Sequence, residues 1–139
     1  MRPIRYIAVH CTATSPEVPV SAIQQYWKRE LGWKYPGYHY LIKADGKIVN
    51  LLPLSQPANG VKGHNATSVN ISYIGGIDLL GNPKDTRTDA QKRSLLQLIK
   101  SLKKRYPAAR IQGHRDFTGV KKACPSFDAK EEYKNIGPK

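Results

Sequence analysis

Short apolar runs typical of β-strands alternate along this chain with segments of helical periodicity. Residues 6–9 indicate a buried strand that leads into His10, and residues 68–77 indicate another strand that ends in two glycines. Apolar residues recur at helical spacing around Trp27 and again after Gln91. Because these elements alternate without a strict βαβ repeat, we expect one α/β domain over residues 1–139, with a central mixed β-sheet flanked by helices.

Two short motifs indicate local geometry directly. Asp45-Gly46 lies between two strand-like runs, residues 38–43 and 47–51, and predicts a hairpin whose tight turn uses the positive φ angles of an Asp-Gly pair. The segment from Thr88 to Gln91 has the pattern of a capping box and predicts the first turn of an amphipathic helix.

Serine and glycine residues mark the ends of the remaining elements. We expect Ser21 to cap a helix that Gly32 ends. Ser126 is expected to cap a short last helix that runs through Tyr133. A short strand over residues 110–112 should lead to His114.

The chain carries a strong excess of positive charge. Lys and Arg number 23 against 10 Asp and Glu, which gives a net charge of +13 and a sequence pI near 9.9. This balance predicts a polyanionic partner, and both nucleic acid and the anionic polymers of a bacterial wall satisfy it. No nucleic-acid motif accompanies the basic residues, so a solvated basic face also stays open.

The first residues contain no apolar stretch long enough for a signal peptide, and the chain contains none long enough for a membrane span. We therefore expect synthesis in a cytoplasm, no membrane insertion and, without an evident association motif, a monomer. In that compartment the two cysteines, Cys11 and Cys124, are better suited to metal binding or catalysis than to a disulfide.

His10, His114 and Cys124 each stand at or just beyond the end of a predicted element. Such positions hold side chains on a scaffold while leaving them open to a substrate. Two histidines and a cysteine meet the demand of a catalytic zinc site, which has three protein ligands and a water. The spacing alone does not distinguish this site from histidines with structural roles. Cys11 should face away from His10 and lie in the core, because successive strand residues point to opposite faces.

Six short strings lie in one order along the chain and carry a family resemblance. They are VHCTAT (9–14), GYHYLIKADG (37–46), IGGID (74–78), TDAQ (88–91), GHRD (113–116) and KACPSFD (122–128). Together they resemble the type 2 N-acetylmuramoyl-L-alanine amidase family, in particular the small phage lysozyme-type amidases, which are related to peptidoglycan recognition proteins.

The resemblance implies an amidase/peptidoglycan recognition protein-like fold, and hydrolysis of the amide bond between N-acetylmuramic acid and L-alanine in bacterial peptidoglycan. It matches His10, His114 and Cys124 with Zn²⁺ ligands. It also matches Tyr38 with a tyrosine beside the metal and Lys122 with a lysine needed for hydrolysis. Zinc lowers the pKa of a bound water to about 7 and polarises a carbonyl. Either Tyr38 or Lys122 would stabilise the negative charge that develops on the carbonyl oxygen.

Further side chains near these motifs are candidates for contact with the substrate or a ligand. His64 and Asn65 lie on a loop, and we expect them to line the groove for the muramyl peptide. Asp116 is a candidate to orient His114 through a hydrogen bond, with a surface ion pair as the alternative.

Three alternative functions remain open. The first is a module that binds peptidoglycan without cutting it, although members that only bind commonly lack a ligand. The second is a cysteine hydrolase in which Cys124 is the nucleophile and His114 is its base. The third, implied by the resemblance alone, is an additional role as a phage-type inhibitor that binds RNA polymerase.

The resemblance also implies a source and a route to the wall. An endolysin of a phage or prophage, made without a signal peptide, would reach the wall through a holin or another secretion device and would be bacteriolytic. Action on wall fragments inside the cell is the alternative.

Overall fold

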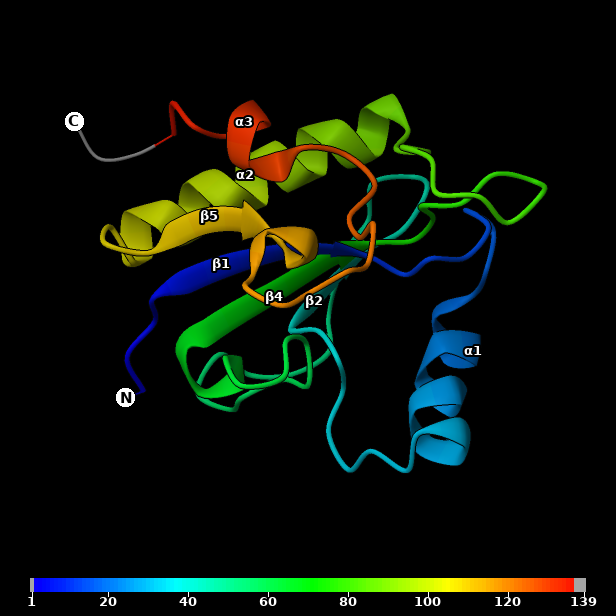
Figure 1. Cartoon of the computed structure of the whole chain (residues 1–139), viewed down its shortest axis with the longest axis horizontal. Coiled ribbons are helices and arrows are strands. Elements are labelled where there is room, and N and C mark those ends of the chain that lie inside the picture. Colours follow the sequence, from blue (N-terminus) through cyan, green and yellow to red (C-terminus); the bar gives the residue numbers. More distant parts are fainter. Residues whose placement is uncertain (1, 137–139) are drawn as a thin grey trace.

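The computed structural model describes residues 2–136 and contains one β-sheet with helices packed on it (Figure 1). The strands are β1 (Tyr6–Cys11), β2 (Tyr40–Ile42), β3 (Ile48–Asn50), β4 (Ser68–Tyr73) and β5 (Arg110–Gly113). The helices are α1 (Val20–Gln25), α2 (Asp89–Arg105) and α3 (Ala129–Glu132), with a π-helical turn η1 (Tyr26–Glu30) after α1 and 3₁₀ turns at η2 (Asn65–Thr67) and η3 (His114–Asp116).

The five strands lie in the order β3-β2-β4-β1-β5. β1 pairs in parallel with β4 and β5, and β2 pairs in parallel with β4. β3 runs antiparallel to β2 and makes the sheet mixed, which confirms the predicted fold class. Because four of the five strands are parallel, their carboxyl ends lie at one edge of the sheet.

Neighbouring residues of β2 show how two layers cover the sheet. Ile42 packs in the larger core with Leu95 of α2. Leu41 packs with Ile23 of α1 and Trp27 of η1. The two residues belong to different cores because successive strand residues point to opposite faces. Figure 1 accordingly shows α2 and α3 together along one side of the sheet, with α1 well away from them.

Both motif-based predictions are confirmed, with one correction. β2 and β3 form the predicted hairpin, and Gly46 has a φ of +90°. Asp45 has no positive φ, because the turn is longer than two residues: the Gly46 N–H donates to the Lys43 carbonyl at 2.8 Å, and only the glycine takes a positive φ. The Asp45 carboxylate accepts the Lys47 N–H at 2.9 Å. Thr88 and Gln91 form a reciprocal capping box with two hydrogen bonds of 3.0 Å, and α2 begins at the next residue after Thr88.

Two predicted helix caps are wrong. Ser21 lies inside α1, whose cap residue is Pro19: the helix begins without a side-chain cap, and the Pro19 carbonyl accepts its first backbone hydrogen bonds, from Ala22 and Ile23. Ser126 has a φ of +69°, and its hydroxyl donates to the Gly76 carbonyl at 3.0 Å. Asp128 caps α3 instead, since its carboxylate accepts a backbone N–H of the first helical turn.

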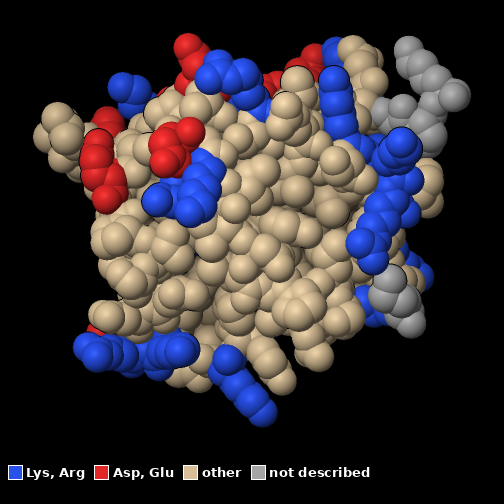
Figure 2. All heavy atoms as spheres, turned by 180° about the vertical axis from the view of Figure 1, so that it is seen from behind, with Lys and Arg blue, Asp and Glu red and all other residues tan. Residues whose placement is uncertain are grey.

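On one face of the molecule the basic side chains do not gather into a central patch (Figure 2). Figure 2 shows Lys and Arg side chains at the margins of the face opposite to that of Figure 1, around a centre with few charges. None of the helices within residues 2–136 has the length and apolar character needed to cross a membrane.

Candidate metal centre

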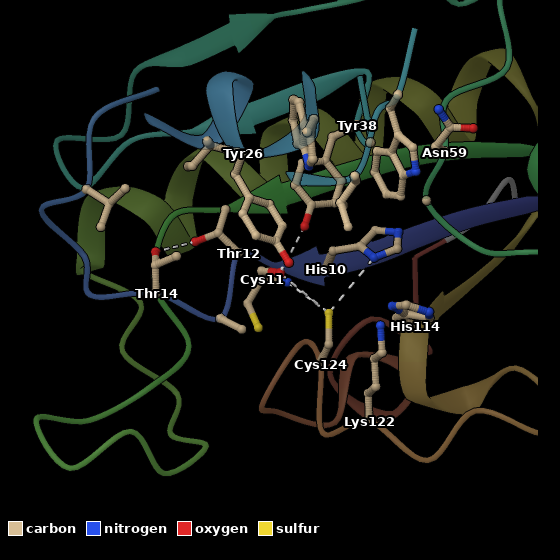
Figure 3. Close-up of a pocket in the computed structure, with 18 of the residues that line it drawn as sticks. His10, Cys11, Thr12, Thr14, Tyr26, Tyr38, Asn59, His114, Lys122 and Cys124 are labelled. Atoms are coloured by element: carbon tan, nitrogen blue, oxygen red, sulfur yellow. Dashed lines mark hydrogen bonds between the residues drawn. The ribbon is translucent and has the colours of Figure 1, made fainter. Parts of the chain in front are cut away.

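His10, His114 and Cys124 come together at the carboxyl edge of the sheet. β1 and β5 are parallel neighbours, with Val9 opposite Gly113, so the histidines that follow these two residues lie side by side. Cys124 reaches them from the loop before α3. The donor atoms of the three side chains all lie within 4.8 Å of one another, and Figure 3 shows their convergence from three separate segments.

One nitrogen of the His10 ring is already occupied. Nε2 lies 2.7 Å from the Oδ1 atom of Asn70 on β4. An amide oxygen only accepts hydrogen bonds, so Nε2 carries the proton and Nδ1 keeps its lone pair. Nδ1 lies 3.9 Å from the Cys124 sulfur. His10 therefore presents an unprotonated nitrogen to the other two donors.

Burial keeps both histidines neutral at physiological pH. His10 is 1% exposed, and burial, followed by the nearby His114, lowers its pKa to about 3. Burial, followed by the charge of Lys122, lowers the pKa of His114. The neutral imidazole is the form in which histidine binds a metal.

Cys124 is a free thiol that accepts a hydrogen bond from the Cys11 backbone N–H at 3.1 Å. The neighbouring Cys11 sulfur, followed by burial, raises the pKa of the Cys124 thiol. The Cys11 side chain packs in the core on the α2 side of the sheet, where the strand alternation predicts it. A cation bound at Cys124 would therefore displace a proton from this thiol.

Two further polar groups border the three donors. The Tyr38 ring lies 5.1 Å from the His10 ring, and its hydroxyl donates to the Cys11 carbonyl at 3.2 Å. Burial, followed by the charge of a Cys124 thiolate, raises the pKa of Tyr38, so its phenol stays protonated at neutral pH. The Lys122 side chain is exposed and extends toward His114 and Cys124 (Figure 3).

These groups form one end of a pocket of about 670 Å³. The rest of its wall is largely apolar and comes from α1, η1 and the segments around them. The wall residues include Val18, Ala22, Ile23, Tyr26, Trp27, Leu31 and Trp33. An apolar wall with a few convergent polar groups is typical of a ligand site.

The structure does not bring every predicted residue to this pocket. The His64 ring packs against two other aromatic rings outside it, and Asn65 accepts a hydrogen bond within its own loop. Both precede β4 and so lie near the amino edge of the parallel strands, whereas the donors lie at the carboxyl edge. Asn59 and Gly60, earlier in the same loop, line the pocket instead.

Asp116 makes neither the candidate contact with His114 nor, among residues 2–136, the alternative ion pair. The Asp116 carboxylate accepts the Gly113 N–H at 2.8 Å and thereby closes the η3 turn. Among the two histidines of the cluster, it is His10 that makes such an orienting hydrogen bond: its Nε2–H donates to the Asn70 amide oxygen. Sequence reasoning misses Asn70, because it identifies β4 only as a buried strand.

Comparison with known proteins finds relatives over most of the chain. A family model described as N-acetylmuramoyl-L-alanine amidase matches residues 1–127. The endolysin of Klebsiella phage KP32 is 42% identical to this chain over 126 residues, which are 89% of this chain and 82% of that protein.

Solved structures share the fold. The Ph2119 endolysin from the Thermus scotoductus MAT2119 bacteriophage Ph2119 has a TM-score of 0.81 and 26% identity, covering 99% of this chain and 88% of that one. Drosophila Peptidoglycan Recognition Protein SA has a TM-score of 0.75 and 19% identity over 100% of this chain and 85% of that one, a likeness of fold alone. The match of family model and relatives over most of the sequence shows that this chain belongs to the type 2 N-acetylmuramoyl-L-alanine amidase family.

Proposed function

We propose that this protein is a zinc-dependent amidase that cleaves the bond between N-acetylmuramic acid and L-alanine in bacterial peptidoglycan. The observation that carries the proposal is the convergence of His10, His114 and Cys124 within 4.8 Å at the end of a largely apolar pocket. Family membership supplies the class of reaction, and the endolysin relatives are the basis for placing it at the bacterial wall.

The three donors suit zinc by their chemistry. Zinc binds imidazole nitrogen and thiolate sulfur, and its catalytic sites combine three protein ligands with one open position. His10 offers Nδ1 in the right protonation state, and the pocket leaves one side of the three donors accessible. When bound, zinc would supply a Lewis acid and a bound water with a pKa near 7.

Lys122 is proposed to stabilise the negative charge that develops on the scissile carbonyl oxygen. Its ammonium extends toward the donors from the exposed side of the pocket (Figure 3). Preorganised charge of this kind acts strongly where water is partly excluded. No Asp or Glu occurs among the described residues that line the pocket, so the site offers no carboxylate as a general base.

Tyr38 is proposed to exchange its hydrogen bond to the Cys11 carbonyl, 3.2 Å long, for one to the reacting group, and its raised pKa keeps the phenol protonated as a donor. Tyr38→Phe removes the hydroxyl and keeps the ring that packs beside His10. Turnover should fall by about 10²–10⁴-fold while the zinc content stays unchanged. Full activity in Tyr38→Phe would remove this tyrosine from the mechanism.

The pocket suits a muramyl peptide in size and character. Its volume of about 670 Å³ falls among ordinary ligand pockets. Tyr26 and Leu31 on its wall are 54% and 40% exposed, so part of the apolar surface is available to a ligand. We propose that this wall holds the sugar and the first stem residues while the polar end receives the amide bond.

Digestion of purified peptidoglycan tests the proposal. Zinc-loaded protein should release stem peptides with a free N-terminal L-alanine, identified by mass spectrometry, and a chelator should abolish this release until zinc is restored. Binding of the wall without cleavage would instead indicate a recognition module. Cleavage that resists chelation but is blocked by thiol alkylation would indicate Cys124 as a nucleophile.

A further inference from the structure

Asn70 reaches the metal centre from the middle of β4, where it is fully buried. The parallel register places it opposite Ala8, and residues two apart on a strand share a face, so Asn70 and His10 point to the same side of the sheet. The contact between Asn70 Oδ1 and His10 Nε2, at 2.7 Å, joins positions 60 residues apart. Asn70 lies outside the six strings that carry the family resemblance.

Stability does not explain an asparagine at this position. Its flanking residues, Val69 and Ile71, are apolar and fully buried. The Asn70 Nδ2 group has no hydrogen-bond partner among residues 2–136. A buried donor without a partner is unfavourable compared with an apolar side chain of the same shape. The side chain is therefore better explained by what its oxygen does than by how it packs.

The loop beside Asn70 leaves room for its amide. A Cβ atom on Gly60 would lie 2.1 Å from Asn70 Oδ1 and 2.2 Å from its Cγ, far inside van der Waals contact. Gly60 has no positive φ, so space rather than backbone conformation requires glycine here. Gly60 and His10 both line the pocket, and the Asn70 amide lies behind them, next to Gly60 and in contact with His10.

We propose that Asn70 is the positioning residue of the zinc ligand His10, an inference that rests on the proposed zinc site. Its amide oxygen holds His10 as the Nε2–H tautomer, so the Nδ1 lone pair stays directed toward Cys124. Gly60 preserves the space in which the amide makes this bond. A hydrogen bond to the second ring nitrogen fixes the tautomer and orientation of metal-binding histidines.

Zinc affinity is the first test, measured by competition with a chromophoric chelator at constant pH. Asn70→Leu keeps the approximate shape but loses the acceptor, and zinc binding should weaken about 10–100-fold. Asn70→Asp keeps an acceptor oxygen and should bind zinc at least as tightly as the wild type. Ser68→Ala is the matched control, because it removes another buried polar group without a partner from the same strand. Its zinc affinity should not change.

The tautomer of His10 is a readout that a merely structural role would not move. In metal-free protein labelled with ¹⁵N-histidine, NMR should show His10 as the Nε2–H form, and Asn70→Leu should shift it toward a mixture. Gly60→Ala should also weaken zinc binding by displacing the amide, but it should add no loss in an Asn70→Ala background, where the clash is relieved.

The outcomes separate this inference from the proposed function. A wild-type protein that binds no zinc overturns the proposed zinc site itself. A wild-type protein that binds zinc, together with an Asn70→Leu variant of equal affinity and tautomer, overturns only the role of Asn70. If Asn70→Leu does not fold, the wild-type spectrum still decides, because an Nδ1–H tautomer at His10 contradicts the proposal.

Discussion

Two buried polar clusters in this protein are built in opposite ways. The first surrounds Arg87, just before α2, whose guanidinium contacts Asp85 at 2.8 Å and Glu132 of α3 at 2.7 Å. The same guanidinium lies 3.4 Å above the Phe127 ring. All three guanidinium nitrogens thus donate to carboxylates inside the cluster, which connects α3 to the segment that precedes α2.

The second cluster consists of His10, His114 and Cys124. Its groups are neutral, and the contact between Cys124 Sγ and His10 Nδ1 is long, at 3.9 Å. His10 lies at the end of β1, His114 directly follows β5, and Cys124 lies in the loop before α3; the pocket begins beside them. Under the proposed function, a metal ion from outside the chain would complete this cluster.

The difference separates a structural use of buried polarity from a functional one. Polar groups that satisfy one another hold elements in place, whereas groups that converge without satisfying one another indicate a ligand. We therefore expect changes in the Arg87 cluster to act on stability, and changes in the donor cluster to act on zinc binding and catalysis.

The largest effect is expected from Cys124→Ala, which leaves two histidines as protein ligands. Amidase activity should fall to background and zinc binding should be lost, because a catalytic zinc site needs three protein ligands. Cys11→Ala is the control, since it removes the adjacent thiol from the core. It should reduce stability while hydrolysis continues. An active Cys124→Ala enzyme would mean that the cluster is not the catalytic site.

Replacement of Lys122 comes next in size. Lys122→Met removes the charge beside the donors and should lower turnover by about 10²–10³-fold, with zinc content unchanged. Lys121→Met changes the neighbouring exposed lysine, which does not line the pocket, and should leave turnover intact. Equal losses in both variants would assign the effect to overall charge. Steady-state kinetics on a soluble muramyl peptide distinguishes these results.

Arg87→Leu should affect stability instead of zinc binding. Removing one partner of a fully buried ion pair costs about 3–5 kcal/mol. Here Asp85 and Glu132 keep side-chain exposures of 32% and 43%, so the loss should be nearer to about 1–3 kcal/mol. Urea unfolding measures it, and zinc affinity of the folded variant should match that of the wild type. A large loss of zinc affinity would show that the two clusters are coupled.

Acid should remove the contribution of Arg87 gradually. Hydrogen bonds from Arg87 lower the pKa of Glu132 below its ordinary value of 4.5. Burial opposes the ionisation of Asp85, but its bonds to Arg87 outweigh burial and lower its pKa as well.

A carboxylate with a lowered folded-state pKa adds stability above its unfolded pKa and loses it as the pH falls through the folded value. The stability difference between wild type and Arg87→Leu should therefore be constant near neutral pH and shrink below about pH 4.5. A difference that persists undiminished in acid would contradict the ion-pair account.

Local chemistry explains which parts of the fold are predictable from the sequence. The turn at Gly46 and the cap at Thr88 are predictable, because each depends on residues within a few positions. The serine caps fail because α1 begins at Pro19 without a side-chain cap, and because the Asp128 carboxylate, close by in the chain, caps α3.

The donor cluster is predictable only in part. Its three residues follow from the family resemblance, and the structure adds that they meet because β1 and β5 are parallel neighbours. The contact of Asn70 with His10 depends on the register of β1 against β4, which no local pattern contains. His64 and Asn65 do not line the pocket. The sequence does not tell at which edge of the sheet their loop lies, and that edge decides whether they can reach the pocket.

A zinc titration of metal-free protein, followed by the release of new N-terminal L-alanine from peptidoglycan, tests the central claim most directly. Activity should be absent without metal, rise in proportion to added zinc and reach its plateau at one zinc per chain. Full activity before any zinc is added, or zinc bound at that ratio without hydrolysis, would contradict the assignment of His10, His114 and Cys124 as a catalytic metal site.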